Sequence, residues 1–475
     1  MVPLLRASLL ASLFLGLAEG TGSGLVGRIT DKGLDYARQE GVAVLLQRLT
    51  QLNLPEFSGS FKVNVLGHVD YDFHSMNIHT FQLPSSVVAP VPGVGLRVSI
   101  DNAYAELTGQ WKVKKRRWFK DHGSFDLRVE GISISLDLKL GNDAAGKPTA
   151  STSDCRAHIS EVHVHISSRL GWLYNLFHSH IEGALRRTME GKVCEDVTSS
   201  VQSKLHPFLQ TMPVTARIDK MAGIDYSLVG PPKVTTNALD LNLKGEWFSL
   251  RHRSPPPSPP PALNFSVGHD RMLCLGISSH FFNTAGDVYY KAGALTFQVT
   301  DNMVPKEFRI RLNTSSFVAF VPQVQKLYPN MPMKLEVSPS SAPSLTITPE
   351  GLSLTPAVDI QAFAILPNST LAPLFVLAAR TTLSANAAVN STKISGVLKL
   401  GRLQLSLKHS EIGSFSVQLI QALMNYYAAS VLLPQMNARL AEGFPLPLPD
   451  HLQLSNTVLQ MHQDFLLIGA DVSWV

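Results

Sequence analysis

Alternation of apolar and polar residues is the clearest pattern in the first half of the chain. Residues 103–113 place apolar side chains at alternate positions with polar ones between them, which predicts a half-buried strand. A second alternating run covers residues 125–140, but its phase slips by one position near Glu130-Gly131. One extra residue in a β-bulge repairs such a slip and increases strand twist. We therefore expect long, strongly coiled antiparallel strands.

Helical spacing of apolar residues marks the segments that flank these strands. Residues 31–52 carry apolar side chains near helical spacing until Pro55. A second such segment starts near Ser168 and continues to Pro207. Both patterns predict amphipathic helices that end at a proline.

The second half of the chain repeats this order of strands and helix. Alternating strands, such as the run over residues 393–409, precede a turn at Gly413 and an amphipathic helix from about Phe415. We expect this helix to kink at Pro434. The repeat is one of pattern and not of residue identity.

A proline-rich segment separates the two halves. Residues 254–261 contain six prolines, which remove backbone donors and favour an extended, semi-rigid conformation. We therefore expect an N-terminal domain over residues 21–250, a linker over 251–263 and a C-terminal domain over 264–475.

The start of the chain has the pattern of a secretory signal peptide. Arg6 precedes the apolar run 9–18, and small residues follow, so residues 1–20 are expected to be removed. This run is too short to span a bilayer. Four Asn-x-Ser/Thr sequons fit entry into the secretory pathway and are candidate glycosylation sites. They are Asn264, Asn313, Asn368 and Asn390.

Length and cysteine count limit the class of protein. A chain of 475 residues with 45% apolar residues can bury large cores in two or more domains. Three cysteines exclude a small disulfide scaffold, but an oxidising compartment permits one bridge. We favour Cys155 and Cys194 as the pair, which leaves Cys274 as a small buried residue.

Positive charge is concentrated at one place. The net charge of +5 is shared almost evenly between the halves, so neither is strongly basic and recognition of an anion requires a local cluster. That cluster is residues 111–123, between the two alternating strands, and we expect residues 115–123 to form a hairpin tip. Cations interleaved with Trp118 and Phe119 suit an anionic membrane surface. A solvated basic loop and a nucleic-acid patch are the alternatives, and the signal peptide disfavours the second.

Two phosphate-loop patterns lack the required context. Residues 22–27 match a dinucleotide fingerprint but lie at the signal-peptide junction with no strand before them. Residues 141–147 match the start of a P-loop, but Pro148 replaces the hydroxyl residue that would bind Mg²⁺. We expect a turn after a strand there.

Metal and hydrolase motifs are equally weak. His163 and His165 share one strand face with His158 nearby, and Glu161 is the only carboxylate that could join them, so we favour an exposed pair over a zinc site. The sequence holds no Gly-x-Ser-x-Gly or His-Glu-x-x-His motif. We therefore expect no enzyme activity, no metal and no cofactor.

Six short segments, spread over residues 24–475, resemble the bactericidal/permeability-increasing and lipopolysaccharide-binding protein family. They are Gly33-Leu34-Asp35-Tyr36-Ala37, Phe81-Gln82-Leu83-Pro84-Ser85-Ser86, Gly171-Trp172-Leu173, Asn425-Tyr426-Tyr427, Gly443-Phe444-Pro445-Leu446-Pro447 and Phe465-Leu466-Leu467-Ile468-Gly469-Ala470-Asp471-Val472. The resemblance implies an α+β fold, an elongated two-domain boomerang. Each half would be a twisted antiparallel β-barrel packed with long amphipathic helices, and a central β-sheet would join them. Each half would also hold an apolar pocket for phospholipid acyl chains.

The resemblance also implies where the ligand binds. Family members recognise lipopolysaccharide through basic residues at the tip of the N-terminal half. The matching positions and their aromatic neighbour are Lys112, Lys114, Lys115, Arg116, Arg117, Trp118 and Lys120. The family disulfide falls on Cys155 and Cys194. Residues 61–69 keep only Lys62, where relatives carry more cations, which leaves the size of the basic surface open.

The function implied is binding of lipid A on Gram-negative bacteria, with permeabilisation of the outer membrane and neutralisation of endotoxin. The proline-rich linker favours this bactericidal branch. The alternative is a carrier of lipopolysaccharide or phospholipid that delivers lipid to host receptors without killing. We expect an antibacterial protein of innate immunity, secreted or held in leukocyte granules. We also expect a monomer that binds phospholipids and no nucleic acid.

Overall fold

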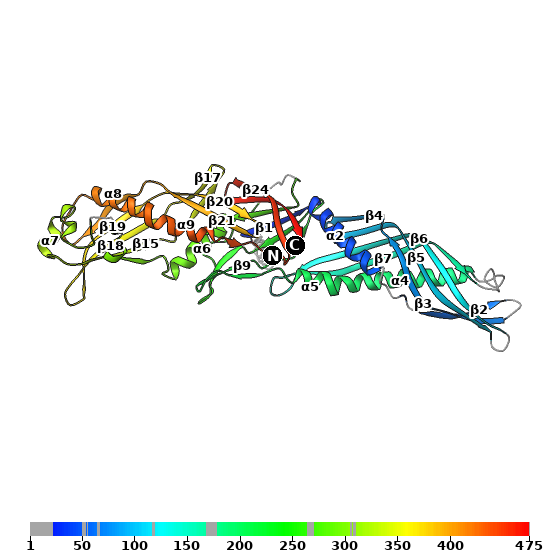
Figure 1. The fold of residues 1–475 in the computed structure, drawn as a ribbon. Helices are drawn as coiled ribbons and strands as arrows, with labels where there is room; N and C mark the ends of the chain where they lie inside the picture. Colours follow the sequence, from blue (N-terminus) through cyan, green and yellow to red (C-terminus); the bar gives the residue numbers. More distant parts are fainter. Residues whose placement is uncertain are drawn as a thin grey trace, which may run out of the picture.

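The computed structural model describes residues 22–49, 54, 56–63, 67–115, 119–167, 178–263, 270–304, 306 and 310–474. The expected signal peptide and Asn264 lie outside these residues. Figure 1 shows an elongated molecule with a strand-rich half at each end and a junction of further strands in the middle. The expected two-domain α+β architecture is confirmed.

The N-terminal half is built on long, curled antiparallel strands. They are β2 (Phe57–Val63), β3 (Gly67–Gln82), β4 (Ser85–Val91), β5 (Gly95–Lys115), β6 (Phe119–Asn142) and β7 (Pro148–Ile166). The sheet order is β2-β3-β5-β6-β7, and β4 also pairs with β5. The expected strand over residues 103–113 is therefore part of the much longer β5.

The predicted β-bulge is present in β6. Val129 pairs with Ala105 and Ile132 pairs with Ala103, so two residues of β6 stand opposite one residue of β5. Gly131 has a φ of +60°, which a residue without a Cβ adopts at low cost. Both Val129 and Ile132 are buried. The bulge thus keeps the apolar side chains of β6 inside on both sides of the phase slip.

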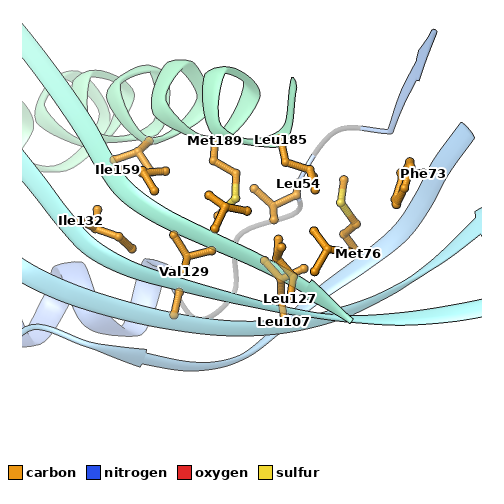
Figure 2. Packing of buried hydrophobic residues seen from close by; sticks show 14 of the residues in the cluster. Leu54, Phe73, Met76, Leu107, Leu127, Val129, Ile132, Ile159, Leu185 and Met189 are labelled. Carbon is orange, nitrogen blue, oxygen red and sulfur yellow. The ribbon is translucent and has the colours of Figure 1, made fainter. Parts of the chain in front are cut away.

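Helix α4 (His178–Ser200) covers the inner face of this sheet (Figure 1). Figure 2 shows Leu185 and Met189 pointing from the helix toward Val129 of the sheet. The buried side chains of the helix recur at every fourth position and continue into the π-helical turn η1 (Val201–Leu205). They are Ile181, Leu185, Met189, Val193, Val197 and Val201. The short helix α5 (His206–Leu209) follows, with Pro207 in its first turn.

Helix α2 (Asp31–Leu49) differs from its expected pattern. Leu34 is buried and Leu45 is half-buried, but Ala37, which has helical spacing from Leu34, is exposed. Helix α2 contacts β4 more than any other strand. Because β4 is an edge strand, the middle of the helix has little sheet to cover.

A six-stranded antiparallel sheet joins the halves, in the order β10-β11-β1-β13-β25-β24. Its strands are β10 (Lys233–Val234), β11 (Ala238–Leu243), β1 (Leu25–Thr30), β13 (Leu273–Ser278), β25 (Phe465–Trp474) and β24 (Leu452–His462). A smaller sheet beside it contains β8 (Thr215–Arg217), β9 (Ala222–Asp225) and β12 (Glu246–Ser249). Residues 251–263, which include the proline-rich segment, contain no helix or strand.

Two five-stranded antiparallel sheets form the C-terminal half. One contains β14 (Phe297–Thr300), β15 (Met333–Pro339), β18 (Ala357–Ile365), β19 (Leu371–Arg380) and β22 (Gln404–Ser410). The other contains β16 (Leu345–Thr348), β17 (Gly351–Leu354), β20 (Leu383–Asn390), β21 (Lys393–Leu400) and β23 (Phe444–Pro445). The alternating run over residues 393–409 is thus divided between sheets, because residues 401–403 leave the ladder.

Helices complete the C-terminal half. They are α6 (Ser279–Lys291), α7 (Gln323–Leu327), α8 (Gln418–Tyr427) and α9 (Leu433–Ala441), with the short 3₁₀ turns η2 (Asp301–Met303) and η3 (Ser316–Ala319). A π-helical turn, η4 (Ala428–Leu432), connects α8 to α9. Pro434 lies in the first turn of α9. The irregularity that we expected as a kink at Pro434 is therefore the π-helical turn η4, which ends just before this proline.

A buried carboxylate connects the first helix to the last strand. Asp471 of β25 accepts hydrogen bonds from Lys32 Nζ at 2.8 Å and Asn456 Nδ2 at 3.1 Å. The hydrogen bond from Lys32 holds the pKa of the Asp471 carboxyl below its ordinary value, although burial opposes this shift. Residues more than 400 positions apart thus stabilise each other at the centre of the molecule.

Removing the disulfide should destabilise the N-terminal half. Cys155 of β7 is bonded to Cys194 of α4, which closes a loop with a sequence separation of 39, and such a loop contributes roughly 4 kcal/mol in the chain-entropy model. The Cys155→Ala/Cys194→Ala variant should show a lower midpoint in chemical unfolding. Wild-type protein treated with reductant should show the same loss. An unchanged midpoint would mean that the bond does not constrain the unfolded chain.

Asp471→Asn should destabilise the protein in a pH-dependent way. A carboxyl whose pKa is lowered by folding adds stability above its ordinary pKa, and that stability is lost as pH falls through the folded value. We expect Asp471→Asn to lower the free energy of unfolding by about 1–2 kcal/mol at pH 7. The difference from wild type, measured by denaturant titration, should shrink below about pH 4. A constant difference over this range would contradict the assigned ion pair.

Candidate functional site: a cationic hairpin

The basic cluster lies at the far end of the longest ladder in the N-terminal half. Strands β5 and β6 stay paired as far as Lys115 opposite Phe119. Arg116, Arg117 and Trp118 lie outside the described residues. The hairpin is therefore narrower than the tip expected over residues 115–123, because Lys115 and Lys120 belong to the strands.

The described lysines of the ladder face outward. Lys112, Lys114 and Lys120 are exposed, whereas Trp111 and Val113 between them are buried. Lys114 stands directly opposite Lys120. Like charges at opposed positions destabilise a ladder, so an anion bound between them would relieve repulsion. The ladder thus presents part of the expected site on one face.

Strand β3 brings two carboxylates next to these lysines. Asp70 is opposite Lys114, and Asp72 is opposite Lys112. His74 Nδ1 lies 3.8 Å from Asp72 Oδ2. These aspartates could not be assigned to the site from the sequence. The register between β3 and β5 shifts at two irregularities, so the sequence does not show which residues of the two strands stand opposite each other.

The candidate zinc histidines gain a partner that the sequence missed. Ligand atoms of Glu130, Glu161 and His163 lie within 4.8 Å of one another on the outer face of β6 and β7. Glu130 pairs with Arg128 at 2.7 Å, and His163 Nε2 lies 3.1 Å from Glu161. The group is a solvent-facing cluster in which Arg128 and His163 each lie beside a carboxylate, and His165 is not part of it. Only the strand register, which sets Glu130 opposite Glu161, reveals this proximity.

The phosphate-loop patterns are structural. Residues 25–27 lie in β1. Residues 143–147 form the turn between β6 and β7, in which Asp143 Oδ1 accepts hydrogen bonds from the backbone N–H groups of Ala145 and Lys147. This confirms the expected turn.

The remaining candidate residues lie apart from the hairpin. Cys274 is buried in β13, and burial raises the pKa of its thiol to about 11. Asn368 and Asn390 are exposed. Asn313 is half-buried, and its side-chain oxygen accepts a hydrogen bond from Ser316 N at 2.7 Å. Glycosylation at these sequons stays a prediction.

The C-terminal half contains a partly open apolar cavity that the sequence did not locate. Strands β14, β15, β18 and β19 line one side and α8 lines another. The lining residues are Val299, Val304, Ile310, Arg311, Leu312, Phe317, Leu335, Ile360, Phe375, Leu377, Ile420, Leu423, Met424 and Tyr427. Arg311 turns its guanidinium toward Asp301, at 2.9 Å. Apolar strand faces have the same pattern whether they line a core or a cavity, so no sequence signal identifies this one.

Among the helices within the described ranges, none combines the length and apolarity needed to cross a bilayer.

Comparisons with known proteins agree on one family. Residues 33–208 match the N-terminal domain of the LBP / BPI / CETP family, and residues 216–474 match its C-terminal domain. Lipopolysaccharide-binding protein of Bos taurus is 45% identical over 98% of this chain and 98% of its own length. Bactericidal permeability-increasing protein of Rattus norvegicus is 41% identical over 98% of this chain and 96% of its own length.

A solved structure supports the same assignment. The crystal structure of a lipopolysaccharide binding protein is 43% identical and covers 96% of this chain and 99% of its own, with a TM-score of 0.68. Two family models together match most of the chain, and the relatives match it nearly end to end. The chain belongs to the LBP / BPI / CETP family.

Proposed function

We propose that this chain is a secreted protein that binds lipopolysaccharide through the end of the β5–β6 hairpin. The observation that carries the proposal is the outward display of Lys112, Lys114 and Lys120 on one exposed ladder. Two relatives of nearly the same length are a lipopolysaccharide-binding protein and a bactericidal permeability-increasing protein. We infer binding and not catalysis, because these relatives are named for lipopolysaccharide binding and for increasing permeability, and neither is named for an enzyme activity.

Charge is the first step of the proposed mechanism. Lipid A carries phosphates, and each lysine or arginine near an anionic membrane surface contributes about 1 kcal/mol. The hairpin cations compete with the divalent ions that bridge neighbouring phosphates. Aromatic side chains favour the headgroup level of a membrane, so Trp118 follows the cations into the surface. The outer membrane then becomes more permeable.

A carrier without killing activity is the alternative function. It would use the same hairpin to extract lipopolysaccharide and transfer it to a host receptor. A lipopolysaccharide-binding protein and a bactericidal permeability-increasing protein have similar identity to this chain, at 45% and 41%. Both functions require lipopolysaccharide binding, so only a measurement of outer-membrane permeability distinguishes a bactericidal protein from a carrier.

We also propose that the apolar cavity of the C-terminal barrel takes acyl chains of a phospholipid. Its lining is almost wholly apolar, with Arg311 as the one charged residue among the lining side chains. Met424 and Tyr427 of α8 form one wall, and nine of the ten residues of this helix are partly buried or exposed. An acyl chain would cover the apolar surface that α8 leaves open.

Neutralising the hairpin should weaken lipopolysaccharide binding while leaving the fold intact. We expect Lys114→Gln, Lys115→Gln, Arg116→Gln and Arg117→Gln together to reduce affinity by at least tenfold, because four cations no longer meet lipid phosphates. Binding to immobilised lipopolysaccharide is measured at several salt concentrations, and the variant should depend less on salt.

The matched control carries Lys326→Gln, Lys334→Gln, Lys393→Gln and Lys399→Gln in the C-terminal half. This control should bind as wild type does. Equal affinity of the hairpin variant and wild type would exclude the hairpin as the site. If wild type binds Gram-negative cells without permeabilising them to a dye, the carrier function stands instead.

Filling the C-terminal cavity should exclude the bound lipid. Met424→Trp places a larger side chain in the cavity wall, so we expect less than half of the wild-type phospholipid per protein. Lipid is extracted with organic solvent and measured by mass spectrometry. Leu419→Trp, on the exposed side of the same helix, is the control and should keep its lipid. Unchanged lipid content in Met424→Trp would contradict the assignment of this cavity.

A further inference from the structure

We infer that Asp70 and Asp72 of β3 determine specificity by confining anion binding to the end of the hairpin. The inference rests on the proposed function, because it concerns the same cationic site. It adds two residues that oppose binding next to those that favour it. Removing these carboxylates should therefore strengthen binding of anionic lipid.

Strand register places each aspartate on the cationic face. Asp70 stands opposite Lys114, and Asp72 stands opposite Lys112. The buried neighbours Val69, Tyr71 and Phe73 point to the barrel interior, so both carboxylates point outward. Directly opposed side chains in an antiparallel pair lie about 5 Å apart at Cβ. Each aspartate is thus within one side-chain length of a lysine.

Two rows of outward side chains cross the sheet at these positions. The row nearer the hairpin end contains Ser60, Asp70, Lys114 and Lys120. The row below it contains Ser58, Asp72, Lys112 and His122. With neutral imidazole, the first row has a net charge of +1 and the second has none. Positive charge therefore decreases away from the hairpin end.

The aspartates stand opposite the lysines in the ladder but form no salt bridge with them. Within the described residues, neither Lys112 nor Lys114 has a carboxylate oxygen within 4.0 Å of its ammonium. Side-chain exposure of Asp72 is 44%. A phosphate that approached Lys112 would therefore meet a hydrated carboxylate close by, and Coulomb repulsion would offset the attraction of the lysine. In the row nearer the hairpin end, one carboxylate, Asp70, faces two lysines, Lys114 and Lys120, so the positive charge is only partly compensated.

The test is a gain of affinity. Asn is close in size to Asp, and Asp70 is exposed while Asp72 is partly exposed, so circular dichroism and thermal unfolding of Asp70→Asn and Asp72→Asn should match wild type. Lipopolysaccharide binding is measured at pH 8, where imidazole is generally neutral, and at low salt. We expect roughly threefold tighter binding for each change and a steeper salt dependence for the double variant.

The matched control is Asp126→Asn. Asp126 is also exposed on the outer face of the sheet, but it lies opposite Thr108 and His165 and away from the lysines. It is four residues along β6 from His122, or about 13 Å, which exceeds the Debye length of about 8 Å at physiological salt. At 150 mM salt, this variant should bind as wild type does, whereas the double variant should remain tighter.

A coupling measurement separates local compensation from a general change of net charge. Lys112→Met should weaken binding about threefold more in the Asp72→Asn background than in the wild-type background. Equal losses in both backgrounds, or no gain in the double variant, would overturn the inference. Failure of wild type to bind lipopolysaccharide would instead overturn the proposed function.

Discussion

The ladder between β5 and β6 is the interaction on which the N-terminal half depends. These strands of 21 and 24 residues supply the inner face that α4 covers and the outer face that carries the lysines. Because strand side chains alternate between faces, a shift of one residue would exchange the two sets. Two irregularities prevent this exchange: the bulge at Gly131 adds a residue to β6, and an extra residue of β5 between Ile100 and Ala103 stands opposite Ser133. The register of this ladder therefore determines both which side chains pack in the core and which charges face a ligand.

Much of this arrangement follows from the sequence. Alternation predicted the two long strands, the phase slip predicted the bulge, and the run from Lys112 to Lys120 predicted a cationic hairpin. The lateral neighbours of these residues could not be predicted. Asp72 and Glu130 reach their partners across a ladder whose register is set by irregularities and by packing of the whole sheet. The apolar cavity could not be predicted for another reason: the strands that line a cavity and the strands that pack in a solid core have the same pattern of apolar residues.

The central sheet makes the two halves interdependent. Strand β1 lies between β11 of the first half and β13 of the second. A single apolar cluster contains Leu25, Tyr226 and Phe281 together with Leu466 from the last strand. Tyr226 also donates a hydrogen bond from its hydroxyl to Pro445 O at 2.5 Å. Either half without the other would expose part of this cluster to water, although the family models divide the chain in two.

The buried stripe of α4 has a geometric consequence for the whole barrel. Each residue of an α-helix turns by about 100°, so positions four apart are displaced by about 40°. From Ile181 to Val201 the stripe therefore winds about 200° around the helix axis. A flat sheet would touch such a stripe at one end only. Helix and sheet can stay in contact along their full length only if the sheet coils around the helix, so the side-chain spacing of α4 and the curl of β5 and β6 specify each other.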